Sequence, residues 1–490
     1  MLMFFTGLLI LILGYIFYGQ LVERIVGIDE KRVTPAVADS DGVDYVVLPQ
    51  WKNMMIQLLN IAGVGPVIGV IIGIKFGAIV FLIIPIGNII GGAVHDFVAG
   101  MMSLRDHGAN LPVLIEKNNG KVFSAIFTVF MTVLLLLVVA VFITTPAQLC
   151  ASLAPAAKSP VMWVAVAAIF IYYIASTIFP VDKIIGRIYP LFGALLLVGT
   201  GILFVKLMLA SDADPSLLKE SVGFRERMWM AADNKPIIPL LFVTIACGIL
   251  SGFHATQAPI IARTMRSERE ARCDFYGMMV VEGFIAMVWA AAGLAIYNLF
   301  PEKMGDKAPE VLQFLCKHFL GSWAGGLVVI SVIILSITSG DTAMRSLRLS
   351  LAEILHIPQK KLVTRVLLCL PIIAIVALLI WWSSISQSTF NQLWNYFAWG
   401  NQVLAACTLT VATEWLLARK RNAVVTIIPG MFMTFIVLCY ILWISRAHGG
   451  PVGFGLKLHV AEIIAGVLAV LGTGLSVWRG FKMRKSLNCD

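Results

Sequence analysis

The stretch 248-GILSGFHATQAPIIARTMRSEREAR-272 decides the fold, because it begins as an apolar membrane-type segment and then interrupts itself. Between Gly252 and Pro259 it places a histidine, a threonine and a glutamine in a short run. Proline removes a backbone donor and glycine weakens a helix, so a helix through this stretch is predicted to break. In a bilayer the freed backbone groups are tolerated only where protein or a water-filled cavity satisfies them. The stretch therefore indicates a polar site inside an apolar protein.

The whole chain has the composition of an integral membrane protein. Of its 490 residues 59% are hydrophobic and 13% are charged, with a mean hydropathy of +0.90. A soluble domain carries about 25% charged residues. At roughly 20 apolar residues per span, we expect an all-α protein with about 13 transmembrane helices. The expected spans cover residues 2–22, 54–74, 77–103, 122–148, 160–180, 186–209, 237–262, 275–300, 321–342, 363–382, 390–417, 423–444 and 457–478.

Basic residues orient the chain. They gather in alternate loops: residues 263–272, the loop expected from Arg345 to Arg365, the "ARKRN" loop and the C-terminal tail. Because Lys and Arg are enriched in cytoplasmic loops, we expect the N-terminus outside and the C-terminus in the cytoplasm. The net charge of +10 then requires no nucleic-acid partner. The eight cysteines show no metal-ligand spacing, so we expect no metal and no cofactor.

A second interruption lies five spans before the first. The segment "NIAGVGPVIG" places Asn60, Gly63, Gly65 and Pro66 within one span. That span enters from the cytoplasmic side and the one around His254 enters from outside, so the two run in opposite directions. A packing kink accounts for either interruption alone, but the pair is typical of a five-plus-five inverted repeat with two broken helices, in which substrate binds near the midplane.

Three carboxylates lie inside expected spans. Asp96 follows His95 in the third span, Glu282 lies in the eighth, and Asp341 ends the ninth after Thr338 and Ser339. A carboxylate at mid-membrane costs at least about 2.5 kcal/mol, so each needs a partner or water. The three carboxylates are therefore candidate ion or proton sites. For Asp341 the alternative is a plain salt bridge to Arg345, one helical turn away.

At these residues the sequence resembles the carbon starvation protein A family of bacterial membrane transporters. The resemblance runs from about residue 45 to 420, and its most specific blocks are "GGAVHDFVAGMMSLRDHGANLP", "SGFHATQAPIIARTM" and "ITSGDTAMRSLRLSLAE". It implies a LeuT-like fold in the amino acid, polyamine and organocation transporter superfamily. It also implies uptake of peptides across the bacterial cytoplasmic membrane during starvation, with relatives that import pyruvate together with protons. Many family members extend further at the C-terminus.

The resemblance implies that the break from Gly63 to Pro66 and the one from His254 to Gln257 contact substrate. Together with the polar residues of the eleventh span, which can bond peptide amides, the expected substrate-binding residues are Asn60, Gly63, Gly65, His254, Thr256, Gln257, Trp399, Asn401 and Gln402. The candidates for holding the coupling ion or proton are His95, Asp96, Glu282, Thr338, Ser339 and Asp341. Thr338 and Ser339 match a hydroxyl pair that often faces sodium in LeuT-like folds. The residues leave proton and sodium both open, and the family favours a proton.

We therefore expect a secondary active transporter for short peptides, coupled to a cation gradient, with a pyruvate or small-carboxylate symporter as the alternative. An N-terminal extra helix with its loop would occupy residues 1–45, the transport core 46–420, and two peripheral helices with a basic tail 421–490. An ATP-driven pump would need a GxxxxGK[ST] loop, which the sequence lacks. A channel is less consistent with paired broken helices. An intramembrane aspartyl protease using Asp341 and Asp96 is a distant alternative, because such a dyad does not account for two antiparallel breaks.

Overall fold

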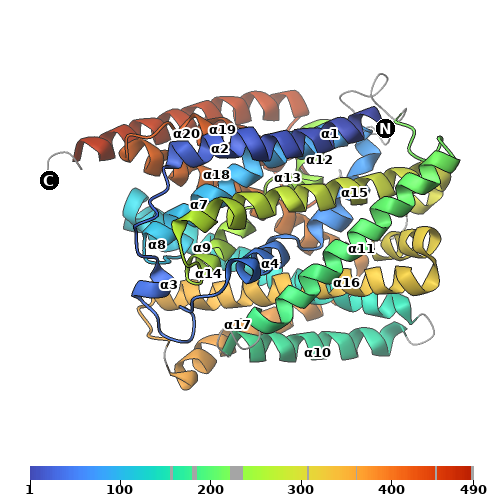
Figure 1. The fold of residues 1–490 in the computed structure, drawn as a ribbon, viewed down its shortest axis with the longest axis horizontal. Helices are drawn as coiled ribbons and strands as arrows, with labels where there is room; N and C mark the ends of the chain where they lie inside the picture. Colours follow the sequence, from blue (N-terminus) through green and yellow to red (C-terminus); the bar gives the residue numbers. More distant parts are fainter. Residues whose placement is uncertain are drawn as a thin grey trace.

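Most of the long helices run in roughly one direction and form a layered bundle, and α11 (Ile185–Ala213) crosses them obliquely (Figure 1). This computed structural model describes residues 1–154, 158–178, 185–220, 235–305, 308–359, 361–446 and 450–486. Helix α1 (Leu2–Leu13) begins and helix α20 (Leu458–Ser486) ends at opposite ends of the bundle in Figure 1. The chain is thus a multi-pass membrane protein.

Each of the 13 expected spans falls on helical residues. Within the described residues, ten helices are long and apolar enough to cross a membrane, and one bent pair is an eleventh span. The two other expected spans, 237–262 and 390–417, fall on a broken helix and on a long helix of mixed polarity. The straight spans include α9 (Lys121–Leu153), α10 (Lys158–Ile178), α11 (Ile185–Ala213), α15 (Met278–Leu299), α17 (Leu362–Ser384), α18 (Gln387–Ala418), α19 (Val424–Trp443) and α20 (Leu458–Ser486).

The remaining spans are interrupted or joined from shorter pieces. The first span comprises α1 (Leu2–Leu13), η1 (Gly14–Tyr18) and α2 (Gly19–Val26), and the third comprises α6 (Val80–Gly87), η4 (Asn88–Gly92) and α7 (Ala93–Arg105). The first broken span comprises α4 (Gln50–Ile61), η2 (Gly65–Gly69), α5 (Val70–Gly73) and η3 (Ile74–Phe76). The second broken span comprises α12 (Ile237–Thr244), α13 (Ala246–Ile249) and α14 (Phe253–Ala262). Short connecting helices are α3 (Pro35–Ala38), α8 (Leu111–Asn119), η6 (Glu268–Glu270), η7 (Arg272–Gly277) and η8 (Pro301–Gly305).

The longest helix, α16 (Ala308–Ile354), packs along α9 and α11 in the interior of the bundle. It bends at Gly321, whose positive φ of 77° favours glycine, and it continues to Ile354. The expectation that Arg345 and Arg348 lie in a loop is therefore wrong. Both residues are on α16, and both are completely buried. The apolar run ends near residue 342, but the helix continues past it, where the one buried Asp44 carboxylate pairs with both arginines.

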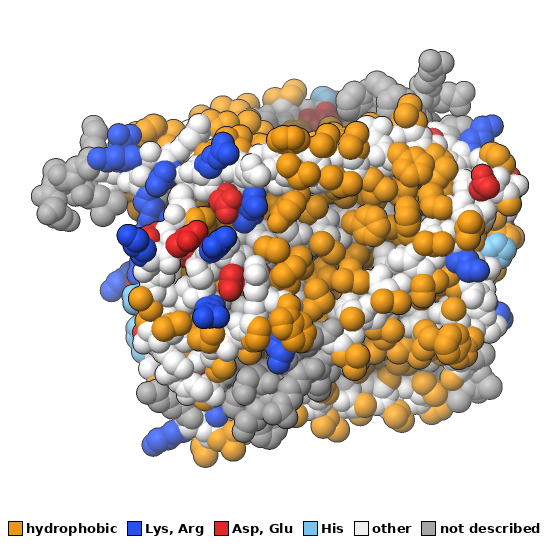
Figure 2. Space-filling model, viewed as in Figure 1, with side chains coloured by type: hydrophobic (Ala, Val, Ile, Leu, Met, Phe, Trp, Pro, Cys, Tyr) orange, Lys and Arg blue, Asp and Glu red, His pale blue; other side chains and the backbone are white. Residues whose placement is uncertain are grey.

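Charged and apolar side chains occupy different parts of the surface. Figure 2 shows lysines, arginines and carboxylates gathered on the side of the C-terminus, beside a broad apolar area over the middle of the helices. We call the end that holds loops 263–272 and 355–359 the basic end. The apolar area is the surface expected to face lipid, since bilayer interiors accept few charges.

Candidate functional site

The two broken helices lie side by side and run in opposite directions. Asn53 on α4 accepts a hydrogen bond from the Thr264 hydroxyl just after α14 (2.9 Å), near the basic end. Beyond the breaks, a Cβ built on Gly65 would lie 2.3 Å from the Cβ of Cys247 on α13, and one on Gly69 would lie 2.7 Å from the Thr244 carbonyl oxygen. As the residue numbers rise along the first broken span, those of its contacts in the second broken span fall. The two spans are therefore antiparallel, and their breaks lie at the same depth in the bundle. Gly65 is needed there for the close approach.

Each break follows from the local sequence. The broken span of residues 50–76 bends by 57° between Ile61 and Gly65, with Pro66 in the first turn of η2. The broken span of residues 237–262 leaves helical geometry at Leu250, whose backbone is extended (φ −168°, ψ 113°), and resumes as α14 at Phe253. Glycines and a proline at these points favour interruption over a continuous hydrogen-bond ladder.

Protein side chains satisfy the main chain at the second break. The Asn401 carbonyl oxygen accepts from the Gly252 N–H (3.1 Å), and its side-chain oxygen accepts from the Phe253 N–H (2.6 Å). The Asn401 amide also donates to the Ser251 hydroxyl (2.8 Å). On the other side, Asn88 of η4 donates to the carbonyl oxygens of Gly248 (3.3 Å) and Met279 (2.9 Å). Asn401 was a sequence-predicted substrate ligand, and here it holds the break; Asn88 was missed, although an asparagine in an apolar run was the available signal.

Four titratable residues from three helices form what we call the histidine–carboxylate cluster: His95 and Asp96 of α7, His254 of α14 and Glu282 of α15. The Nδ1 atom of His254 lies 3.0 Å from Asp96 Oδ2, and the Nδ1 atom of His95 lies 2.9 Å from Asp96 Oδ1. The Nε2 atom of His254 lies 3.9 Å from Glu282 Oε2. All four side chains are at most 1% exposed. The second broken helix thus carries an imidazole between two carboxylates.

Several buried polar atoms near the breaks have no hydrogen-bond partner among the described residues. They are the side-chain amide atoms of Asn60 and Gln257, both oxygens of Glu282 and the Nε2 atoms of His95 and His254. Buried polar groups are almost always hydrogen-bonded in folded proteins. Such a concentration beside two helix breaks indicates a place where a polar ligand is received.

The hydroxyl pair of α16 lies beside the first break. Ser339 donates to the Leu59 carbonyl oxygen at 2.9 Å, and Thr338 lies 3.4 Å from the same oxygen. A Cβ on Gly63 would lie 3.4 Å from the Ser339 hydroxyl and 2.9 Å from the Phe142 ring. Ser339 and Thr338 therefore direct their hydroxyls at a carbonyl of the broken helix.

Asp341 lies in a different environment from the cluster. The hydroxyls of Ser176 (2.7 Å) and Tyr172 (3.4 Å), both on α10, donate to its Oδ2 atom. Arg345, the alternative partner considered from sequence, donates to Asp44 (3.1 Å) and to the Ser176 carbonyl oxygen. Ser176 therefore contacts both the carboxylate and the guanidinium.

Three other predicted ligands make contacts away from the cluster. The Thr256 hydroxyl donates to the Phe253 carbonyl oxygen of its own helix (2.7 Å). On α18, the Trp399 indole donates to the Val437 carbonyl oxygen of α19 (3.0 Å), and the Gln402 amide donates to the Phe242 carbonyl oxygen of α12 (2.6 Å). The structure does not bring Trp399 to the cluster.

A buried ionic network closes the basic end beneath the breaks. Asp44 accepts from Arg345 (3.1 Å) and Arg348 (3.3 Å), and Arg263 pairs with Glu353. Burial alone raises the pKa of the Asp44 carboxyl, but the charges of Arg348, Arg345 and Arg263 outweigh burial and hold that pKa below its usual value. The loop after Asp44 is tied to the end of α14, because the Leu48 N–H donates to the Thr264 carbonyl oxygen (3.0 Å). No motif in the sequence pointed to Asp44.

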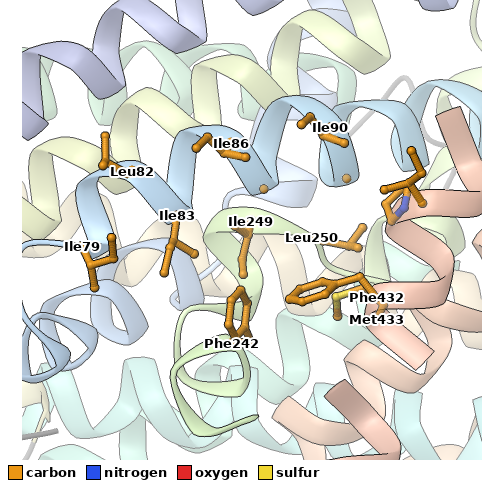
Figure 3. Close-up of a pocket in the computed structure, with 14 residues that line it drawn as sticks. Ile79, Leu82, Ile83, Ile86, Ile90, Phe242, Ile249, Leu250, Phe432 and Met433 are labelled. Atoms are coloured by element: carbon orange, nitrogen blue, oxygen red, sulfur yellow. The ribbon is translucent and has the colours of Figure 1, made fainter. Parts of the chain in front are cut away.

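The apolar cavity in Figure 3 lies behind the second break, between α6, α12 and α19. Its volume is about 450 Å³, and every side chain that lines it is apolar or glycine. Ile249 and Leu250, which end the first half of the broken helix, lie in its wall (Figure 3). A peptide backbone would find no hydrogen-bonding side chain there, so this cavity is not the candidate polar site.

Comparisons with known proteins agree with this geometry. The family described as "Carbon starvation protein CstA" matches residues 1–232, 189–300 and 309–439. An uncharacterized membrane protein of Haemophilus influenzae is 42% identical over 61% of this chain and 92% of its own length. The peptide transporter CstA of Helicobacter pylori is 25% identical over 61% of this chain and 51% of its own. The pyruvate/proton symporter BtsT of Escherichia coli is 24% identical over 58% of this chain and 48% of its own.

The chain thus spans about half the length of these two named transporters. Among solved structures, MhsT in complex with L-phenylalanine superposes with a TM-score of 0.60 over 88% of this chain and 99% of its own, at 13% identity. That likeness shows the fold alone: an all-α LeuT-like arrangement, as the two opposed breaks predicted.

Proposed function

This chain belongs to the carbon starvation protein CstA family, and on that premise we propose that it is a secondary active transporter that imports short peptides with protons. We place transport in residues 46–420, with α19 and α20 as peripheral helices. The N-terminus would face outside and the basic end the cytoplasm of a bacterial cell, because arginines concentrate at that end.

One observation supports transport above all: two antiparallel broken helices have their breaks at one level, beside a buried titratable cluster. Irregular backbone at membrane depth occurs where it faces a cavity or a binding site, and alternating access proceeds by movement of one repeat against the other. An aspartyl protease would need two carboxylates that share a proton. Here Asp96 is bonded to histidines and Asp341 to hydroxyls.

The buried amides favour a peptide as the substrate. Asn60 and Gln257 each offer one acceptor and two donor hydrogens, and both atoms of each amide lack protein partners among the described residues. A peptide group has an N–H and a carbonyl oxygen and complements such amides on both sides. Pyruvate has acceptors only and would leave the amide oxygens unsatisfied, at a cost of about 1–3 kcal/mol each. A carboxylate could still bind a protonated His254, so pyruvate remains the second candidate.

The histidine–carboxylate cluster is the proposed coupling site. An imidazole changes charge near neutral pH, and here it lies between Asp96 and Glu282, so one added proton changes the charge of the whole cluster. Asp96 and Glu282 come from different helices than His254, which lets protonation bias the relative positions of these helices. The Ser339 hydroxyl already bonds the Leu59 carbonyl oxygen, which favours proton over sodium coupling.

The test is uptake by the purified full chain in proteoliposomes. Under an inward proton gradient we expect labelled di- or tripeptides to accumulate and a protonophore to abolish accumulation, with sodium having no effect. Accumulation of pyruvate without peptide uptake would select the second candidate. Hydrolysis of peptides without exchange across sealed vesicles would contradict transport.

A further inference from the structure

A strip of four amides runs along one face of α4. Gln50, Asn53, Gln57 and Asn60 follow one another at spacings of three, four and three residues, which keeps them on one side of a helix. The strip begins at the basic end and ends beside the first break. Asn53 is bonded to Thr264. Both side-chain polar atoms of Gln57 and Asn60 are buried and have no partner among the described residues.

Two carboxylates lie along the neighbouring span formed by η7 and α15, which packs against α4. Asp274 and Glu282 are eight residues apart, so two four-residue steps place them on one side of this span. The first turn, η7, is π-helical, and π turns are frequent at functional sites. Both carboxylates are fully buried, and their oxygens have no hydrogen-bond partner among the described residues.

Contacts at both ends connect the strip with these carboxylates. Near the basic end, Gln50 at the start of α4 is close enough to Asp274 to interact with its carboxyl group. At mid-membrane, Glu282 lies 3.9 Å from His254 of the cluster. At 1.5 Å per residue, the eight-residue separation corresponds to about 12 Å between the two carboxylate levels. That distance is too long for a proton to pass directly between the two carboxylates. It is short enough to be bridged by a few water molecules that are held by amide side chains.

We propose that the seam between α4 and α15 carries the coupling proton from the cluster to the basic end, with Asp274 as the inner proton acceptor. This inference rests on the proposed proton-coupled function. Protonated Glu282 gives up its proton to water in the seam, Gln57 and Asn60 orient that water, and the Asp274 carboxylate accepts a proton. Asp274 then releases the proton to the cytoplasm and returns to its anionic form, so charge and protons balance.

The groups around Asp274 suit an acceptor that releases its proton. Glu270 of η6 is a charged group that acts on Asp274, and Cys273 precedes Asp274 on η7. The arginines of this region have other acidic partners: Arg272 lies 3.4 Å from Glu23 of α2, and Arg105 of α7 lies 2.9 Å from Glu268. Asp274 is thus not held in a salt bridge to either arginine.

The experiment compares Asp274→Asn with Glu116→Gln, which changes an exposed carboxylate of α8 away from the seam, in proteoliposomes of known orientation. We expect Asp274→Asn to lower proton-driven peptide accumulation about tenfold while labelled-peptide exchange stays within about twofold of wild type. Accumulation by Asp274→Asn should also lose its dependence on internal pH, whereas Glu116→Gln should behave as wild type. Asp274→Glu should restore accumulation, and Gln57→Leu should reproduce the Asp274→Asn defect more weakly.

Wild-type accumulation by Asp274→Asn would overturn the inference. So would equal loss of exchange and accumulation, because a purely structural role predicts that result. Failure of the proposed function is distinguishable, since the wild-type protein itself would then show no proton-driven accumulation. A separate readout avoids transport: a pH-jump infrared difference spectrum should lose one carboxylic acid band in Asp274→Asn, and an unchanged spectrum would contradict proton binding there.

Discussion

The histidine–carboxylate cluster and the Asp341 region are two buried acidic regions of one membrane core, but their partners differ. Asp96 lies between two imidazoles and close to a second carboxylate, whereas Asp341 accepts from hydroxyls of Ser176 and Tyr172. Imidazole and carboxylate exchange protons readily, while alcohol and phenol hydroxyls act at neutral pH only as donors or acceptors of hydrogen bonds. The comparison teaches that a carboxylate in a membrane helix is insufficient to identify a coupling site.

The Asp44 network extends the comparison to permanent charge. Arg345 and Arg348 both pair with Asp44, and guanidinium groups in proteins do not act as proton carriers, so these pairs can separate and re-form without releasing a proton from either arginine. We propose that it holds the basic end closed while the cluster changes charge. Variants at the following positions test these distinctions, from the largest expected effect to the smallest.

Replacing Asp44 should have the largest effect on stability. Asp44→Ala leaves two buried guanidinium groups without their shared carboxylate, and we expect a loss of about 3–5 kcal/mol in the free energy of unfolding. Asp39→Asn, which alters an exposed pair with His107, should change stability by less than about 1 kcal/mol. Thermal unfolding in detergent measures both, and equal stability of the two variants would contradict the network.

The same network predicts the direction of a pH effect. Because the folded-state pKa of Asp44 lies below its usual value, its contribution is present above the unfolded-state pKa. It is lost as pH falls through the folded-state pKa. In wild type, acid should therefore remove stability that Asp44→Ala already lacks.

Replacing His254 should remove coupling while leaving a folded protein. We expect His254→Gln to lower proton-driven accumulation about 100-fold, equivalent to about 2.7 kcal/mol. His107→Gln is the matched control, because His107 is an exposed histidine in a loop at the basic end. Surface expression and uptake are the measurements, and undiminished accumulation in His254→Gln would remove the cluster from the mechanism.

Crowding the contact between the broken helices should have an intermediate effect. Gly65→Ala places a Cβ 2.3 Å from the Cys247 side chain, and overpacking of this kind costs about 1–3 kcal/mol. Cys247→Gly should recover part of this loss in the double variant, which a double-mutant cycle would measure. Gly466→Ala, where a Cβ meets no atom within 4 Å, should be neutral. Stability losses that simply add in the double variant would contradict the side-by-side placement of Gly65 and Cys247.

Asp341→Asn should weaken the protein only slightly. The asparagine oxygen can still accept from Ser176, so the stability lost is the difference between a charged and a neutral hydrogen bond, about 1–1.5 kcal/mol. Unfolding of Asp341→Asn beside Ser176→Ala checks this, because losses that add fully would mean the two side chains do not interact.

Ser339→Ala should give the smallest change. It removes one neutral hydrogen bond to the Leu59 carbonyl oxygen, worth about 1 kcal/mol. Uptake should be the same in sodium and in choline buffers for wild type and variant alike. A sodium requirement that disappears in Ser339→Ala would instead assign a cation to this hydroxyl pair.

Much of the fold was predictable from the sequence, because long apolar runs and paired glycine–proline interruptions each have a direct backbone consequence. The break at Gly63 was predicted at its position, whereas the second break lies at residues 250–252, just before the predicted stretch from His254 to Gln257, which is helical in α14. What sequence could not supply was the partner of each polar side chain: Asn401 and Thr256 are polar residues near the break, but both bond to its backbone. His95, Asp96, His254 and Glu282 come from three distant segments, and only tertiary packing places them together.

Arg345 and Arg348 are residues whose location the sequence predicted wrongly. Positive charges after an apolar run usually mark a loop, and no local signal reveals that Asp44, 301 residues from Arg345, neutralises them inside the protein. Local rules therefore describe helices well and long-range ion pairs poorly.

The most direct test of the central claim records lumenal pH and labelled-peptide uptake together in proteoliposomes of wild type, Glu282→Gln and Asp341→Asn. We predict that peptide entry acidifies the lumen in wild type and in Asp341→Asn. Glu282→Gln should exchange peptide without acidification. Acidification that persists in Glu282→Gln and disappears in Asp341→Asn would contradict the account and assign coupling to Asp341.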